Sequence, residues 1–154
     1  MSLLPVAILV GGLATRMRPL TQTVPKALLD VAGRPFIDWQ LRYLAGQGVA
    51  DVVLCTGYLG EQIEQHVGDG AAFGLRVRYS PDGPKLLGTG GALRQALPLL
   101  GEAFFVLYGD SYLPIDFGAV QRSFEASDCP ALMTVLRNEG RWDKSNVLLD
   151  GARL

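Results

Sequence analysis

Residues Leu9–Pro35, with the sequence LVGGLATRMRPLTQTVPKALLDVAGRP, are the part of this chain that says most about its fold and chemistry. The apolar run Val6–Val10 leads directly into two glycines, Gly11 and Gly12. Such a run is typical of a strand buried on both faces of a parallel sheet. Glycines let the backbone turn tightly there, and successive amide groups in the turn can form an anion site. The stretch therefore predicts a strand that ends in a phosphate-binding turn.

Hydroxyl and cationic side chains follow the two glycines closely. Thr15 can donate a hydroxyl hydrogen bond, Arg16 offers a planar fork for phosphate oxygens, and Lys26 adds a compact charge. The stretch is neither a Walker A loop nor a dinucleotide fingerprint, because the required Gly-Lys-Ser/Thr and third glycine are absent. Two glycines alone would fit an ordinary surface turn equally well. Together with the cations, they favour the binding of a nucleoside triphosphate.

Three separated motifs resemble those of the sugar-phosphate nucleotidyltransferases, also called nucleoside-diphosphate-sugar pyrophosphorylases. The family signature L-A-G-G-x-G-T-R-L-x-P-L-T is matched at most positions of Leu9–Thr21, and the later motifs are Leu87–Leu93 and Tyr108–Asp110. Heptose-1-phosphate guanylyltransferase-like proteins are the most similar group, and N-acetylmuramate-1-phosphate uridylyltransferases are the alternative. The main departure is Ala14, which replaces a glycine of the signature. Alanine fits this position only if its φ angle stays negative.

The resemblance implies roles for individual residues, on the positions that match the family motifs. The implied catalytic residues are Arg16, Lys26 and Asp110, with Asp110 also holding Mg²⁺. The implied nucleotide-binding residues are Leu9, Val10, Gly11, Gly12, Ala14, Thr15, Gly88 and Thr89. The implied substrate-binding residues are Tyr108, Gly109 and Asn146. From position alone, Asp110 could equally cap a turn and Thr89 could cap a helix.

The resemblance also implies a reaction and its partners. A nucleoside monophosphate passes from an NTP, with GTP or UTP favoured, to a sugar 1-phosphate, and the products are an NDP-sugar and pyrophosphate. The alternative is a non-catalytic domain of the same fold that binds sugar nucleotides.

Strand-like and helix-like segments alternate along the chain. The expected strands are Val6–Val10, Asp51–Thr56, Leu75–Tyr79, Phe104–Tyr108 and Ala131–Leu136. The expected helices are Phe36–Leu44, Gly60–Val67, Gly90–Leu97, which ends before Pro98, and Phe117–Ala126. This order predicts one α/β domain over residues 1–154, with three α/β/α layers and a Rossmann-like, mostly parallel sheet. Ligands should bind beyond the carboxyl ends of its strands.

Composition narrows the partners and the compartment. A net charge of −1 gives no reason to expect nucleic acid or an anionic membrane as a partner. No apolar run approaches the ~20 residues of a membrane span, and the first strand starts too early to leave room for a signal peptide. We therefore expect a cytoplasmic protein, in which Cys55 and Cys129 are buried free thiols.

The end of the sequence carries an incomplete structural signal. Asp150-Gly151 is a good hairpin turn, but only three residues follow it. Members of the resembled family are longer, so we interpret these residues as the N-terminal part of a nucleotidyltransferase. Such a part should bind metal weakly without NTP and be nearly inactive. It should also form homo-oligomers through an uncovered strand edge.

Overall fold

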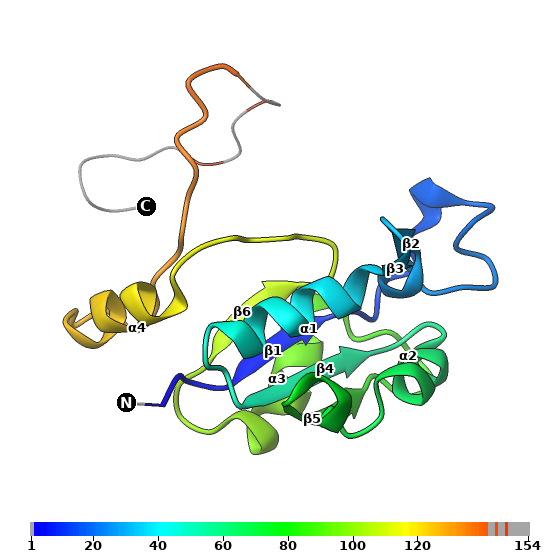
Figure 1. Cartoon of the computed structure of the whole chain (residues 1–154), viewed down its shortest axis with the longest axis horizontal. Helices are drawn as coiled ribbons and strands as arrows, with labels where there is room; N and C mark the ends of the chain where they lie inside the picture. The colour runs from blue at the N-terminus through cyan, green and yellow to red at the C-terminus, as the bar shows by residue number, and fades with distance from the viewer. Residues whose placement is uncertain (1, 142–143, 145–146, 148–154) are drawn as a thin grey trace. The chain divides into compact units, whose positions relative to one another are not determined.

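The computed structural model describes residues 2–141, 144 and 147, and the chain divides into two compact units, Met1–Gly118 and Ala119–Leu154. The first unit contains a four-stranded parallel sheet (Figure 1). Its strands, in spatial order, are β5 (Arg76–Pro81), β4 (Asp51–Thr56), β1 (Val6–Leu9) and β6 (Phe105–Tyr108). The expected parallel α/β architecture is confirmed.

The order of the strands places a switch point beside β1. The chain runs from β1 to β4 and β5 on one side, and then returns to place β6 on the other side of β1. In register, Leu9 pairs with Cys55 of β4 and with Tyr108 of β6. In open parallel sheets, ligands bind outside the carboxyl ends of the strands at such a point. Gly11 and Asp110 follow β1 and β6 at this position.

Helices cover both faces of this sheet. In Figure 1, α1 (Phe36–Gly46) and α3 (Gly88–Leu100) lie on opposite faces. The fully buried Ile8 of β1 belongs to the core under α1. This core also includes Ile63 of α2 (Gly60–Val67). The neighbouring Ala7 belongs to a second core under α3. Successive residues of a strand point to opposite faces, so an all-apolar strand supplies both cores.

Helix α3 differs from the sequence prediction at both ends. It starts at Gly88, two residues before the expected start, and Thr89 is not its cap. It also continues through Pro98 to Leu100. Proline removes one hydrogen bond from the helix. The buried Ala96 and Leu100 on either side of Pro98 pack against the sheet and hold the last turn in place.

The boundaries of the strands also shift by one or two residues. β1 ends at Leu9, although the Val10 amide still donates to the Cys55 carbonyl at 3.0 Å. β5 runs from Arg76 to Pro81, so its carboxyl end lies two residues beyond the expected Tyr79. A short hairpin that the sequence did not predict pairs β2 (Asp30–Val31) with β3 (Arg34–Pro35).

The second unit corrects two expectations. Helix α4 (Phe117–Glu125) starts at the end of the first unit and continues into the second, close to the expected range. Residues 131–136 form no strand, and Met133 and Leu136 are exposed. An apolar run becomes a strand only when another strand pairs with it, and none pairs with this one among the described residues. Cys129 is a free thiol but is exposed, so its expected burial is wrong.

None of the helices in the described residues combines the length and apolar character that a membrane span requires. The expected hairpin at Asp150-Gly151 lies outside the described residues.

Candidate active site

A pocket of about 350 Å³ lies beyond the carboxyl ends of the parallel strands. It extends from the segment after β5 to the turn after β6, so all four strands of the sheet contribute to its position. The predicted site residues that line it are Leu9, Val10, Gly11, Gly12, Ala14, Arg16, Lys26, Gly88, Thr89, Tyr108, Gly109 and Asp110. Segments far apart in the sequence thus meet in one pocket.

Close backbone contacts form the floor beside the glycine turn. A Cβ on Gly11 would lie 3.0 Å from the amide nitrogen of Gly57, and the Gly11 carbonyl accepts a 3.3 Å hydrogen bond from the Tyr58 amide. A Cβ on Gly12, by contrast, would meet nothing within 4 Å. A side chain on Gly11 would therefore press on the backbone at the end of β4. Gly12 lines the pocket with open space around it.

The loop after the turn bends at Ala14. This residue has φ 47° and ψ 42°, which is the left-handed region, so the expectation of a negative φ is wrong. The fully buried Thr21 holds this bend, because its Oγ1 donates to the Ala14 carbonyl at 2.8 Å. A short 3₁₀ turn, Thr15–Met17, starts directly after this bend. Local strain of this kind is retained only where the surroundings impose it.

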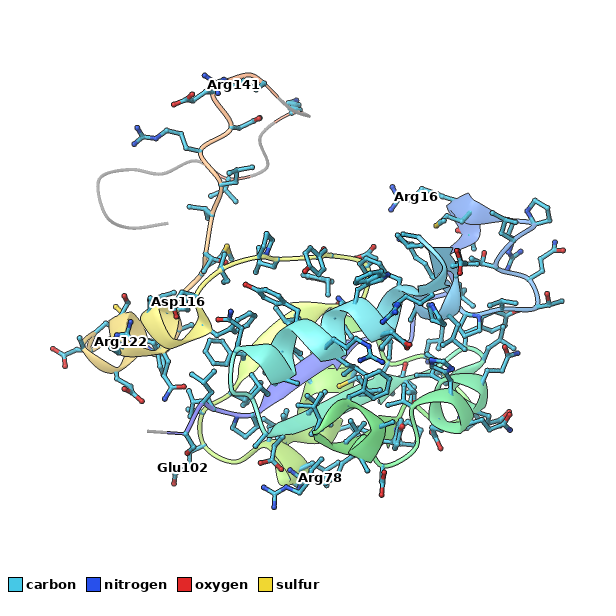
Figure 2. The ribbon with its side chains drawn as sticks, viewed as in Figure 1. Arg16, Arg78, Glu102, Asp116, Arg122 and Arg141 are labelled. Carbon is cyan, nitrogen blue, oxygen red and sulfur yellow. The ribbon has the colours of Figure 1, made fainter. Side chains whose placement is uncertain are left out.

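Arg16 lies on the loop outside the sheet (Figure 2). Its side chain is exposed, and it lines the pocket. Farther along, two side chains near α2 bind the loop. Tyr58 Oη donates to the Gln22 carbonyl at 2.8 Å, and Gln62 Nε2 donates to the Thr23 carbonyl at 2.9 Å. These bonds anchor the loop between Arg16 and Lys26 to the body of the unit.

Lys26 and Asp110 form an ion pair at the β6 side of the pocket. Lys26 Nζ lies 2.8 Å from Asp110 Oδ2, and about a third to a half of each side chain is exposed. The hydrogen bond from Lys26 lowers the pKa of the Asp110 carboxyl, as do the Lys26 charge and a hydrogen bond from Ser111, although partial burial opposes them. The carboxylate is therefore ionised at neutral pH, and its charge faces the pocket.

The opposite end of the pocket holds Asp82. Its Oδ2 accepts a 3.1 Å hydrogen bond from the Leu87 amide at the start of α3. Helix α3 itself has no side-chain cap, because this bond goes to the residue that precedes its first turn. Cys55 also lines this region, where burial raises the pKa of its thiol to about 11 and the Asp82 charge adds to the effect. The thiol is thus neutral at physiological pH.

A divalent cation would find one carboxylate in this pocket. The described residues contain no group of three or more His, Cys, Asp or Glu side chains that could hold a metal ion. Mg²⁺ commonly uses one or two carboxylates and takes its other ligands from phosphates and water. Asp110 fits that use, since it is ionised, half exposed and in the same pocket as the glycine turn.

Among the predicted site residues that the structure describes, Thr15 does not belong to the lining of this pocket. Its neighbours Ala14 and Arg16 on either side do line the pocket. Asn146 lies outside the described residues. Five lining residues were not predicted as site residues: Ala27, Cys55, Asp82, Leu86 and Ala92. Asp82 follows the last residue of β5 directly, so a correct end for that strand would have identified it.

Comparison with known proteins assigns this arrangement to a family. The pattern of the family described as "Nucleotidyl transferase" matches residues 6–143. This chain belongs to that family. Its residues 6–143 include every segment that lines the pocket, so the glycine turn, Lys26 and Asp110 are parts of a nucleotidyl transferase fold.

Several relatives show how this family member compares with others. N-acetylmuramate α-1-phosphate uridylyltransferase of Neisseria meningitidis is 50% identical over 113 residues, which cover 73% of this chain and 49% of the relative. D-glycero-α-D-manno-heptose 1-phosphate guanylyltransferase of Campylobacter jejuni is 33% identical over 125 residues, which cover 81% of this chain and 55% of the relative. The structure of HddC from Yersinia pseudotuberculosis complexed with GMP-PN has 32% sequence identity and a TM-score of 0.72. The match covers 81% of this chain and 56% of the HddC chain. The chain thus spans about half the length of these nucleotidyl transferases.

Proposed function

We propose that the natural protein containing these residues is a sugar-1-phosphate nucleotidyltransferase. The observation that carries the proposal is the ion pair between Lys26 and Asp110, which are 84 residues apart and meet in one pocket with the glycine turn. A structural ion pair alone would not need a glycine turn beside it. A cation that can bind phosphate, a carboxylate that can bind a metal and the backbone amides of a glycine turn together are suited to phosphoryl chemistry. The relatives described above carry names of this activity.

In this proposal the reaction is one in-line displacement. An oxygen of the sugar 1-phosphate forms a bond to the α-phosphorus of the NTP, and the bond from that phosphorus to the pyrophosphate breaks. No general base is required, because the attacking phosphate is already ionised. Catalysis therefore consists of alignment and neutralisation of charge.

Each residue of the pocket then has a defined task. The amides of Gly11 and Gly12 and the guanidinium of Arg16 hold the β- and γ-phosphates. Lys26 contacts the α-phosphate and the incoming sugar phosphate, which reduces the repulsion between them. Asp110 holds Mg²⁺, which when bound supplies further positive charge at the phosphates. To perform these tasks, the ion pair between Lys26 and Asp110 must open, so that Lys26 binds phosphate and Asp110 binds the metal.

The base at the Asp82 end is guanine in our proposal, with uracil as the competing choice. A carboxylate can accept the two adjacent donors, N1–H and N2–H, of guanine. Uracil presents one donor between two carbonyl oxygens, which a carboxylate repels. Asp82 Oδ2 already accepts from Leu87, but each carboxylate oxygen has two lone pairs, so Oδ1 and Oδ2 can each accept one guanine donor in our proposal. We further propose a cytoplasmic protein that forms homo-oligomers.

The test measures pyrophosphate release from each NTP with a panel of sugar 1-phosphates, using the natural protein. Lys26→Ala should lower kcat by at least about a hundredfold, because one fixed charge at the reacting phosphates is lost. Arg94→Ala, which removes a cation from the exposed side of α3, is the control and should leave kcat unchanged. A Lys26→Ala enzyme within about fivefold of wild type would contradict the proposal. If NDP-sugars bind but no pair of substrates reacts, the protein is a binding domain instead.

A further inference from the structure

Gln40 is a polar residue on the buried face of α1, with 4% of its surface exposed. Its neighbours on that face, Ile37, Leu41 and Leu44, are buried and apolar. A buried amide in such surroundings is costly unless it makes hydrogen bonds. Gln40 Nε2 donates two of them, to the Tyr108 carbonyl at 3.1 Å and to the Ser111 carbonyl at 2.7 Å.

These two carbonyls are the two ends of the turn that carries Asp110. The Ser111 amide donates to the Tyr108 carbonyl at 3.2 Å and closes the turn, and Gly109 donates to the Leu9 carbonyl at 2.9 Å. Both of those bonds are made by the backbone. Gln40 adds a side chain that holds both ends of the turn against α1.

The same helix also holds the segment that carries Lys26. The Phe36 amide donates to the Leu29 carbonyl at 3.0 Å, and Trp39 Nε1 donates to the Val31 carbonyl at 2.8 Å. The 3₁₀ turn Lys26–Leu28 directly precedes these carbonyls. Helix α1 is thus a common support for the two charged residues of the pocket.

The side-chain amide of Gln40 acts only as a hydrogen-bond donor among the described residues. Its Oε1 is buried and accepts no hydrogen bond among the described residues. The reverse orientation would point Oε1 at two carbonyl oxygens, which is repulsive, so the orientation is fixed by the two carbonyls. An unpaired buried acceptor costs about 1–3 kcal/mol, and an apolar residue of similar shape would avoid that cost.

We propose that Gln40 is the positioning residue for Asp110, and this rests on the function proposed above. It does not touch the substrate. By holding both ends of the turn, it fixes the direction in which the Asp110 carboxylate faces the metal and Lys26. Residues that orient a metal ligand typically change metal affinity 10- to 100-fold when they are replaced.

The test compares Gln40→Leu with Tyr43→Phe in the natural protein. Tyr43 lies one turn farther along α1, and its hydroxyl donates to the Ile115 carbonyl at 2.8 Å, beyond the Asp110 turn. Mn²⁺ binding is titrated by electron paramagnetic resonance in the presence of a non-hydrolysable GTP or UTP analogue. Melting temperatures are recorded for every variant. Gln40→Asn, which keeps the amide but is too short to reach both carbonyls, is the second variant if Gln40→Leu does not fold.

Gln40→Leu should weaken Mn²⁺ binding at least about tenfold, with a matching rise in the KM for Mg²⁺. The affinity for the metal-free analogue should remain unchanged, and Tyr43→Phe should bind Mn²⁺ as wild type does. Wild-type Mn²⁺ affinity in the Gln40 variants would overturn this inference alone. Equal losses in the Gln40 and Tyr43 variants, in proportion to melting temperature, would also overturn it. A wild-type protein that binds no metal with the analogue would instead contradict the proposed function.

Discussion

Lys26 Nζ and Asp110 Oδ2 lie 2.8 Å apart, and the ion pair they form joins the loop after β1 to the turn after β6. In the proposed reaction, one of these groups binds phosphate and the other binds a metal. Without ligands, each neutralises the other. A metal–nucleotide complex can replace both partners in one event, because it brings a cation for Asp110 and phosphates for Lys26.

The first prediction concerns the stability that this pair provides. Asp110 has a lowered pKa in the folded protein, so its contribution is present above the unfolded pKa, ~3.9, and is lost as pH falls through the folded value. Since 45% of its side chain is exposed, we expect Asp110→Asn to lower the free energy of unfolding by at most about 1 kcal/mol at pH 7. The difference should shrink below about pH 4 in urea titrations. Glu102→Gln, at an exposed carboxylate, is the control; a larger effect there would count against the pair.

The second prediction follows from the left-handed backbone at Ala14. Left-handed geometry costs an alanine about 1–2 kcal/mol, and a glycine adds about 0.4–1 kcal/mol of entropy to the unfolded chain. Ala14→Gly should therefore raise the free energy of unfolding by about 0.5 kcal/mol. Ala96→Gly, in the buried interior of α3, should lower it by about 1 kcal/mol or more. If both changes destabilise the protein equally in urea, the strain at Ala14 is not real.

The third prediction separates two glycines of the pocket. A Cβ on Gly109 would lie 2.5 Å from Val10 Cγ1 and 2.6 Å from the Leu9 carbonyl oxygen, so Gly109→Ala should cost about 1–3 kcal/mol of stability. A Cβ on Gly12 meets nothing, so Gly12→Ala should change stability by less than about 0.5 kcal/mol. It should still weaken NTP binding, because Gly12 lines the pocket and, in the proposed function, its backbone contacts the phosphates. Urea unfolding measures the stability of the two variants, and calorimetric titration measures their NTP affinity. Normal NTP affinity in Gly12→Ala would show that the phosphates do not approach Gly12 closely.

The fourth prediction concerns the two thiols. Cys55 is 1% exposed and has a pKa of about 11, whereas Cys129 is exposed. Only the thiolate attacks disulfide reagents, so Cys55 should react at least about a hundredfold more slowly at pH 7.5. Single variants, Cys55→Ser and Cys129→Ser, assign the two phases of a dithionitrobenzoate assay. Equal rates in both variants would show that the pocket floor opens readily.

Most of the core of the first unit could be predicted from the sequence. Asp51–Thr56 and Gly60–Val67 were predicted with the bounds that the structure shows. An apolar run and a helical period specify such segments locally. The convergence of Gly11 and Asp110 was also predictable, because parallel strands bring their carboxyl ends to one edge.

The features that were missed depend on contacts distant in sequence. Ala14 takes a positive φ because Thr21 holds its carbonyl, which no local propensity reveals. Gln40 looks like an ordinary helical glutamine until its two carbonyl partners, 68 and 71 residues away, are known. Ala131–Leu136 has the composition of a strand, but composition does not provide the neighbour that a strand requires.

The central position of β1 has a consequence for the order in which the site can form during translation. Val6–Leu9 is synthesised before both of its partner strands, since it pairs on one side with β4 and on the other with β6. At about 5–20 residues per second, the ~100 residues up to β6 take roughly 5–20 seconds to synthesise. Until then, one edge of β1 has no partner, and Lys26 has no Asp110. The nascent chain therefore completes its phosphate pocket only when β6 is added.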